Sequence, residues 1–158
     1  MWYQLQNPDT VDSPALLVYK DRIADNIQTM LQMVGGDADR LVPHVKTHKM
    51  KEVVQMQLEA GISKFKCATI AEAEMLASAG AKWILLAYQL VGPKVDRYLS
   101  LAAEYPDVQF GSLLDNEDTA RYLNERCGAR GIRIQVFIDV NNGMDRSGHP
   151  VDERMLSL

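Results

Sequence analysis

The sequence predicts an α/β protein whose parallel sheet is built like part of an eight-stranded (β/α)8, or TIM, barrel. Short apolar runs typical of buried strands alternate with helical patterns along residues 41–158, and such alternation implies parallel strands joined by right-handed crossovers. Each strand and helix unit takes about 24 residues, close to the roughly 30 of a barrel domain of about 250 residues. Since the chain has room for about five units, we expect only the N-terminal part of a barrel.

An open, doubly wound sheet is the alternative architecture for the same alternation. Sheets of that kind often bind a dinucleotide or phosphate at a glycine-rich turn, and neither GxGxxG nor GxxxxGK occurs in this sequence. The missing turn favours the barrel. Because the last residues, VDERMLSL, resemble the beginning of a helix that is cut off, we expect the chain to be the N-terminal portion of a longer protein.

The strands are predicted from apolar runs bounded by turn residues. A strand-like stretch at 15–19 leads into a helix that begins near Asp21 and stops at Gly35 and Gly36. The third run, WILLAY, is apolar on both faces, as in a parallel strand covered by helices. The five barrel strands are expected at 41–46, 64–68, 83–88, 108–113 and 132–140.

Capping and turn residues mark the helices between these strands. Thr69 and Glu72 have the spacing of a capping box, in which each side chain satisfies a backbone N–H at the helix start. Gly92 and Pro93 open the next helix. Asp115 is the predicted N-cap of the helix that follows the fourth strand.

Composition excludes several classes of protein. Of 158 residues, 47% are hydrophobic and 24% charged, which predicts one globular core, and the net charge of −4 argues against a nucleic-acid partner. No apolar run approaches the roughly 20 residues of a membrane span. The N-terminus lacks a basic leader, so we expect a cytoplasmic protein. Two cysteines, Cys67 and Cys127, are too few for a disulfide framework and are expected to pack as small apolar residues.

The segment LVPHVKTHK, residues 41–49, is the most informative for function. It lies where a strand meets a helix, which in a parallel barrel is the mouth where active sites are built. We expect Lys46 to project its amine into a pocket there, where partial burial and neighbouring cations such as His48 and Lys49 lower its pKa toward a nucleophilic range. Such an amine can form a Schiff base. The plainer interpretation is a solvated basic turn.

PHVKTHK closely resembles the cofactor-lysine motif of the fold-type III pyridoxal-phosphate (PLP) enzymes, on their D-threonine aldolase and D-serine dehydratase branch. DSPALLVYKDRIADNI is similar to that family's leading strand and first helix. FKCATIAEAEMLASAGAKWILLAY is similar to its second and third units, and FIDVNNGMDRSG to its fifth-strand motif. The resemblance implies that residues 1–158 are the N-terminal part of a PLP-binding, alanine racemase-like barrel domain, with the family's C-terminal β domain absent from this chain.

The resemblance also implies roles for individual residues. Lys46 matches the lysine that holds PLP as a Schiff base, and Arg146 matches the arginine that contacts the phenolic oxygen of PLP. A fixed guanidinium facing that oxygen makes a charge-assisted hydrogen bond and tunes the ring. The plainer interpretation of Arg146 is a loop arginine paired with Asp139 or Asp145.

Other residues near the expected mouth are weaker candidates. His44 is two positions before Lys46, so on a strand both point inward, and His44 is predicted either to support the PLP pocket or to be an ordinary core histidine. His44 and His48 are four apart, but they straddle a strand end, so we expect no metal between them. Tyr88 and Gln89 end a strand and either line the mouth or pack.

The function implied by the resemblance is a PLP-dependent lyase that acts on D-amino acids, most simply a D-threonine aldolase that releases glycine and an aldehyde. D-serine dehydratase and amino-acid racemase chemistry are the alternatives, of which racemization is disfavoured because PHVKTHK differs from the alanine racemase lysine motif. That branch also carries a divalent metal, Mn or Zn, in its C-terminal β domain, and no residues of this chain correspond to the metal site.

Two interpretations from other classes stay open. One is a non-catalytic PLP-binding protein that shares the barrel. The other is a structural fragment whose open barrel edges are covered by partner chains. We expect a small-molecule D-amino acid substrate and a homodimer, without nucleic-acid or membrane partners, and we expect the 158 residues alone to be inactive.

Overall fold

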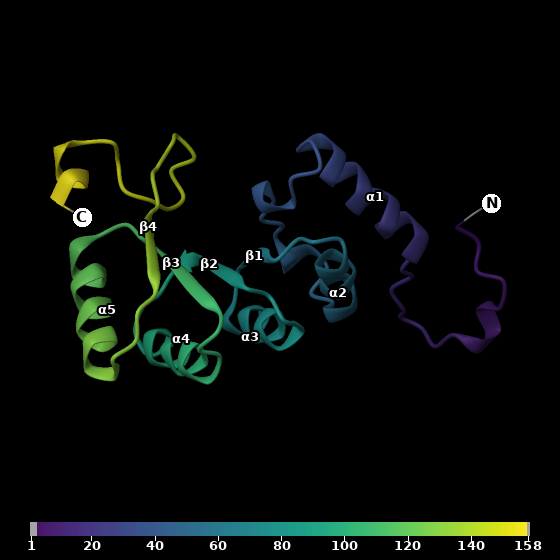
Figure 1. The fold of residues 1–158 in the computed structure, drawn as a ribbon, viewed down its shortest axis with the longest axis horizontal. Coiled ribbons are helices and arrows are strands. Elements are labelled where there is room, and N and C mark those ends of the chain that lie inside the picture. The colour runs from purple at the N-terminus through teal and green to yellow at the C-terminus, as the bar shows by residue number, and fades with distance from the viewer. Residues whose placement is uncertain (1–2, 158) are drawn as a thin grey trace.

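A four-stranded parallel sheet forms the centre of the computed structural model, which describes residues 3–157 (Figure 1). The strands lie side by side in chain order, as expected for successive right-handed units of a barrel. Consecutive strands are connected through helices. The strands are β1 (Lys64–Cys67), β2 (Trp83–Gln89), β3 (Gln109–Leu114) and β4 (Gln135–Ile138).

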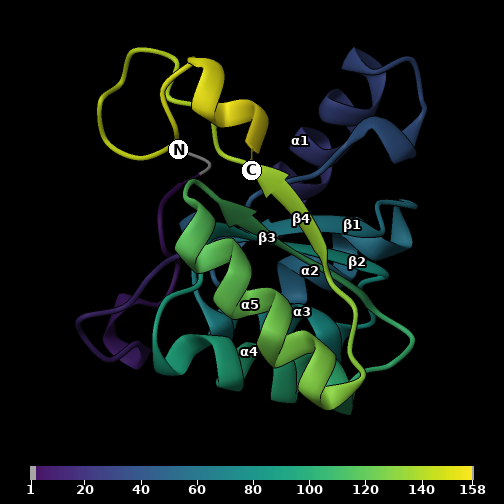
Figure 2. The same cartoon turned by 90° about the vertical axis from the view of Figure 1, so that its left-hand side faces the viewer.

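Three of the helices cover one side of this sheet. Figure 2 shows α3, α4 and α5 below the strands, while the C-terminal segment lies above them. None of the helices in residues 3–157 combines the length and hydropathy needed to cross a bilayer. The helices are α1 (Lys20–Met33), α2 (Lys51–Glu59), α3 (Ile70–Ala79), α4 (Pro93–Glu104) and α5 (Glu117–Arg130).

The core lies between the sheet and the helices. In β1, Phe65 and Cys67 are fully buried, and the alternate residues are only half-buried, which is the two-residue period of a strand with one covered face. Tyr98 of α4 packs edge-on against Phe110 and donates its hydroxyl to the Gly111 carbonyl at 2.8 Å. Both cysteines are free, and burial raises the pKa of the Cys67 thiol to about 12, so Cys67 packs as an apolar residue.

The other face of the sheet is open. Trp83 packs edge-on against Phe137 and donates its indole N–H to the Gln135 side chain at 2.6 Å. Gly111 lies beneath this contact, where a Cβ would touch Leu85 and Phe137 side-chain carbons at 3.4 Å. In a closed barrel this face is the interior. Phe137 is 42% exposed here, so the four strands leave much of that interior uncovered.

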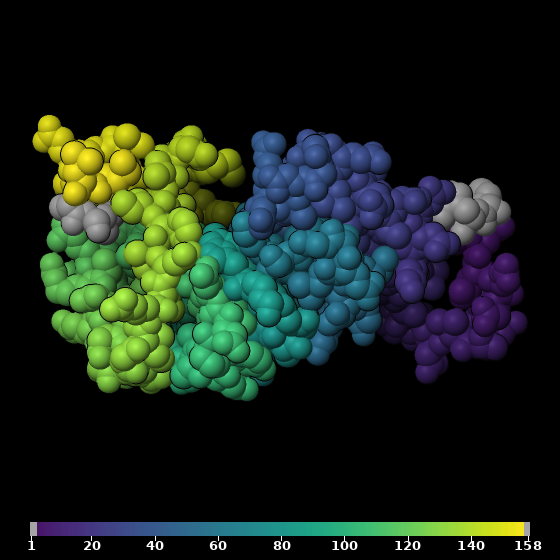
Figure 3. Space-filling model, viewed as in Figure 1, coloured from purple at the N-terminus to yellow at the C-terminus, as the bar shows by residue number. Residues whose placement is uncertain are grey.

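Two predicted strands do not form. Residues 41–46 make only one parallel bridge, His44 to Lys66, before a 3-10 helix at Val45–Thr47. Two backbone donors are missing from a ladder here: Pro43 has no N–H, and the Lys46 N–H is taken by the His44 ring. The stretch at 15–19 belongs to no strand of the sheet, and Leu16 is 76% exposed. Figure 3 shows this N-terminal part, in purple, at the end far from the C-terminal segment.

Several element boundaries also differ from prediction. Strand β4 is shorter than the expected 132–140, because Val140 leaves the sheet to bridge His149. Asn116 caps α5 in place of Asp115, since its side chain accepts the Thr119 N–H at 2.9 Å. The predicted helix at the C-terminal end is a 3-10 helix, Glu153–Ser157. The remaining strands and helices confirm their predicted positions to within a few residues.

Candidate active site

The lysine segment lies against the outer edge of β1. The Lys66 N–H donates to the Pro43 carbonyl at 2.9 Å, and His44 forms the parallel bridge to the same strand. Lys66 is next to the last residue of β1, so Lys46 stands at the C-terminal edge of the sheet. In parallel α/β barrels this edge is where catalytic residues gather. The predicted position at the mouth is therefore present, although the strand that was expected to lead to it is not.

The turn that carries Lys46 is anchored by its neighbour. Val45 is fully buried in the core, whereas Lys46 is exposed. Lys46 was predicted to be partly buried, and that prediction is wrong. Within residues 3–157 nothing covers the sheet face beside Lys46. The structure therefore presents an accessible primary amine on a turn that the buried Val45 side chain anchors to the core.

His44 supports the same turn. Its Nδ1 accepts the Lys46 backbone N–H at 3.3 Å and so caps the 3-10 helix. Burial, followed by the charges of Lys66 and Lys46, holds the pKa of His44 below its ordinary value, and the Glu72 charge opposes this only in part. The imidazole is therefore neutral near neutral pH, as an acceptor at Nδ1 must be. The two side chains do not point inward from one strand as expected, because Lys46 is exposed in a 3-10 helix, and His44 acts on the Lys46 backbone.

His48 has a parallel role at the start of α2. Its Nδ1 accepts the Met50 N–H at 3.1 Å, and burial lowers its pKa. His44 and His48 thus each use Nδ1 on a backbone N–H. Within residues 3–157 no group of three or more His, Cys, Asp or Glu side chains is arranged to hold a metal ion.

A buried carboxylate under the lysine segment was not identified from the sequence. Glu72 is 5% exposed, forms an ion pair with Lys49, and accepts the Ala68 N–H at 2.8 Å. Burial raises the pKa of Glu72, but the hydrogen bonds from Lys49 and Ala68 outweigh it and hold that pKa below its ordinary value. The predicted capping box is half formed: Thr69 accepts the Glu72 N–H, while Glu72 turns to Ala68 instead of Thr69.

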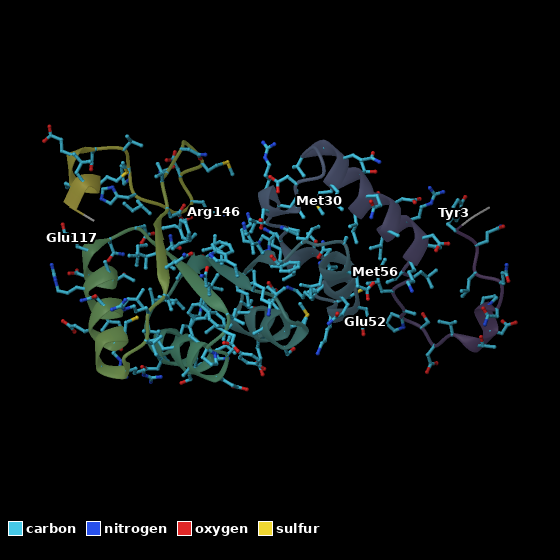
Figure 4. All side chains as sticks on the ribbon, in the orientation of Figure 1. Tyr3, Met30, Glu52, Met56, Glu117 and Arg146 are labelled. Carbon is cyan, nitrogen blue, oxygen red and sulfur yellow. The ribbon has the colours of Figure 1, made fainter. Side chains whose placement is uncertain are left out.

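The loop after β4 carries Arg146 (Figure 4). It is closed at its base by two backbone hydrogen bonds, from His149 N–H to Asp139 at 2.7 Å and from Asn141 N–H to His149 at 2.9 Å. The Asn141 side chain accepts the N–H groups of Gly143 and Asp145 and shapes the tip. Arg146 is exposed on this well-defined loop.

Neither carboxylate expected to neutralise Arg146 does so. Asp145 accepts from the Asn141 amide at 2.9 Å, and Asp139 accepts from the Gln89 amide at 2.8 Å. Across residues 3–157 no ion pair involves the Arg146 guanidinium. The guanidinium is therefore paired with neither of the two aspartates that the plainer interpretation named.

The structure places the two predicted cofactor residues at opposite sides of one edge. Lys46 follows the segment beside β1, and Arg146 follows β4, so the width of the sheet separates them. In the part of the chain that is described, no hydrogen bond or ion pair joins the two. Figure 3 shows the surface hollowed between the segment after β4, in yellow, and the segment before α2, in blue. Gln89 and Asp139 form a bridge from β2 to β4 at this edge.

Tyr88 takes a position that supports the mouth interpretation over packing. It is 55% exposed and lines a small cavity of about 180 Å³ at the ends of β1 and β2. Thr69, Lys94 and Arg97 also line this cavity. No residue of the turn that carries Lys46 lines this cavity.

Residues 18–158 match the family described as alanine racemase, N-terminal domain. The chain belongs to this family. Its membership among the fold-type III PLP enzymes confirms the predicted resemblance, and the four parallel strands of this alanine racemase-type domain are a partial TIM-type barrel.

Curated relatives place the domain more closely. It is 31% identical over 149 residues to a D-threo-3-hydroxyaspartate dehydratase of Delftia sp. (strain HT23), covering 94% of this chain and 39% of that protein. It is 26% identical to a D-threonine aldolase of Arthrobacter sp., covering 94% of this chain and 38% of the relative. The chain thus spans about two-fifths of the length of these relatives.

Solved structures agree with this placement. The domain superposes on the crystal structure of D-threonine aldolase from Filomicrobium marinum with a TM-score of 0.81 and 29% identity, covering 93% of this chain and 39% of that one. An alanine racemase-like protein from Idiomarina loihiensis gives a TM-score of 0.80 at 27% identity, with 96% and 40% covered.

Proposed function

We propose that this domain is the lysine-bearing part of a PLP-dependent lyase that acts on D-amino acids with a β-hydroxyl group. The observation that carries the proposal is the exposed Lys46 amine in PHVKTHK at the C-terminal edge of a parallel sheet, with an unpaired Arg146 along the same edge. The names of the relatives, aldolases and dehydratases of D-3-hydroxy amino acids, support the substrate class.

The residues at this edge fit PLP by their chemistry. The carbonyl carbon of PLP reacts with a primary amine, which Lys46 presents. The phenolic oxygen of PLP binds a cation, which Arg146 presents without a competing carboxylate. When bound, PLP supplies an electron sink for the negative charge left on the substrate Cα. In this proposal Lys46 holds the cofactor and Arg146 binds its oxygen through a charge-assisted hydrogen bond.

His44 completes the set as a backbone support. Because Nδ1 accepts the Lys46 N–H, the imidazole keeps the lysine turn in a 3-10 conformation and adds no positive charge beside the amine. A neutral His44 therefore leaves Lys46 and Arg146 as the groups that meet the cofactor. The role we assign to His44 is to orient Lys46.

We further propose that residues 1–158 are the N-terminal part of a longer chain that closes the barrel and adds a C-terminal β domain. Support comes from the 39% share of the dehydratase relative that the chain spans and from the open sheet face around Phe137. In that arrangement the divalent metal, Mn or Zn, is bound outside this chain, and a second copy of the chain in a homodimer shields part of the open face.

Between the two lyase reactions, we propose D-threonine aldolase activity first, and D-3-hydroxy acid dehydration as the second candidate. The second candidate is favoured by the 31% identity to a dehydratase. The deciding test is product analysis for the intact protein that contains this chain, supplied with PLP and with manganese or zinc. D-Threonine, D-serine and D-threo-3-hydroxyaspartate are the substrates to compare.

Each reaction leaves different products. Glycine and acetaldehyde from D-threonine support the aldolase. A 2-oxo acid and ammonia support the dehydratase. Formation of the L-isomer, or PLP absorbance without turnover of any D-amino acid, would overturn the lyase proposal in favour of a racemase or a non-catalytic binder.

A further inference from the structure

We propose that Glu72 is the positioning residue of the lysine segment: through its ion pair with Lys49 it holds the turn at 45–49 in the shape that presents Lys46. This inference rests on the proposed function, because it assigns a role to Glu72 in placing the cofactor lysine. Glu72 itself touches neither the cofactor nor the substrate.

The first support is the way in which Glu72 is held. Its side chain is 5% exposed at the start of α3, and its two carboxylate oxygens have separate partners, Lys49 on Oε1 and the Ala68 N–H on Oε2. Burying a carboxylate is costly unless it is paired and hydrogen-bonded. Ala68 follows β1 directly, so this bond fixes the carboxylate to the end of the sheet, and Lys49 reaches the carboxylate from the lysine segment.

The second support is the backbone of Lys49. Its φ is +53°, in the left-handed region that side chains other than glycine seldom adopt and that costs energy to maintain. Two interactions hold it there: the Lys49 N–H donates to the Val45 carbonyl at 2.8 Å, and the ammonium reaches Glu72. The Lys49 side chain is 60% exposed, so only the ion pair directs it inward.

The third support is that both ends of the same short turn are tied. His44 accepts the Lys46 N–H at its beginning, and Glu72 holds Lys49 at its end. The negative charge of Glu72 also raises the pKa of both His44 and His48, against the effect of burial. Glu72 thus joins α3 and β1 to a segment more than twenty positions earlier in the chain, which also carries the exposed Lys46.

The experiment compares Glu72→Gln and Lys49→Gln with Lys49→Arg, which keeps the cation. Lys51→Gln removes a neighbouring lysine without touching the ion pair, and Thr69→Ala weakens the α3 cap without touching Lys49. Amide hydrogen exchange is measured residue by residue in the protein without PLP. PLP affinity is then measured by absorbance in the intact protein that contains this chain.

We expect Glu72→Gln and Lys49→Gln each to speed exchange of the Lys49 amide on the order of tenfold, the effect of losing a hydrogen bond to a charged group. Exchange at Leu76 in α3 stays unchanged. PLP affinity falls by about the same factor in both variants. Lys49→Arg, Lys51→Gln and Thr69→Ala keep wild-type exchange at Lys49. Combining the two Gln substitutions gives no further loss, because both remove one interaction.

An unchanged Lys49 amide in Glu72→Gln would overturn the role of Glu72, as would equal effects of Thr69→Ala and Glu72→Gln at Lys49. If the buried Glu72→Gln variant does not fold, Lys49→Gln decides the matter, because that side chain lies mostly in solvent and leaves no cavity. A wild-type protein that binds no PLP would instead overturn the proposed function, and the exchange measurement separates the two failures.

Discussion

His44 Nδ1 accepts the backbone N–H of Lys46 at 3.3 Å, so the imidazole beside the proposed cofactor lysine acts on the main chain of the lysine. A histidine in this position must stay unprotonated at Nδ1. Burial and the nearby Lys66 and Lys46 charges provide that condition by lowering the pKa of His44. The shape of the lysine turn is therefore coupled to proton concentration.

This coupling predicts how stability depends on pH. The pKa values of His44 and His48 are lowered on folding, so the unfolded chain binds more protons than the folded one once the pH falls through the ordinary value of 6.5. The free energy of unfolding should decrease between about pH 7.5 and about pH 5.5. Urea unfolding at a series of pH values measures this free energy. In His44→Gln with His48→Gln the slope in this window should be smaller, and an equal slope would contradict the assignment.

Lys46 should be the residue to which the cofactor attaches in the intact protein. Borohydride reduction followed by peptide mapping should find reduced cofactor on Lys46, because its amine is exposed at the sheet edge while the Lys49 ammonium is held by Glu72. Lys46→Ala should lose activity, and Lys51→Gln serves as the matched control. Label on Lys49 or Lys51, or on no lysine, would refute the assignment.

Arg146 should tune the cofactor without supporting the fold. Since its guanidinium is exposed and pairs with neither Asp139 nor Asp145, Arg146→Ala should leave circular dichroism unchanged. The cofactor absorption should shift and activity should fall, because the oxygen of the ring loses a charge-assisted hydrogen bond. Arg133→Ala, at another exposed arginine, is the control. Full activity with an unshifted spectrum would make Arg146 a surface residue.

Gly148 should tolerate no side chain. Its φ is +97°, and a Cβ there would lie 2.7 Å from the Asn141 nitrogen and 2.8 Å from the Val140 carbonyl carbon, both backbone atoms. Gly148→Ala should therefore destabilise the Arg146 loop by about 1–3 kcal/mol.

The matched control for this substitution is Gly128→Ala in α5. Beyond the adjoining residues and backbone of α5, no heavy atom lies within 4 Å of a Cβ at Gly128, and helix propensity predicts a gain of roughly 0.5–1 kcal/mol. Denaturant unfolding of both variants measures the contrast. Equal effects of the two substitutions would show that the loop relaxes around an added methyl group.

The 158 residues alone should associate. β4 is an edge strand with exposed Val136, Phe137 and Ile138, and such an edge invites pairing with another chain. Sedimentation should show dimers or larger species, weak PLP binding, and no aldolase turnover with added manganese or zinc. Val136→Lys should reduce the association, with Arg133→Lys as control. If the 158 residues were a soluble monomer with D-threonine aldolase activity, the proposal that this partial barrel holds only part of the active site would be wrong.

Much of the fold follows from local sequence. Apolar runs that alternate with helical stripes predicted the parallel sheet. A strand meant to be covered on both faces leaves a continuous apolar run and an amphipathic helix leaves a periodic stripe, and any window of the chain displays both. The lysine motif and the glycine-flanked Arg146 loop were likewise readable, since a motif and a positive φ at Gly148 are properties of a few neighbouring residues.

Only the tertiary structure decided how these segments meet. Residues 41–46 pair with β1 through a single bridge, because Pro43 and the His44 ring remove the N–H donors that a ladder needs. The apolar pattern of these residues does not show which backbone N–H groups are free to pair. The Thr69 and Glu72 spacing predicted a helix cap, yet Glu72 turns to Lys49 and Ala68. A buried carboxylate takes the partner that the packed fold brings within reach, and folding, more than sequence distance, decides which cation that is.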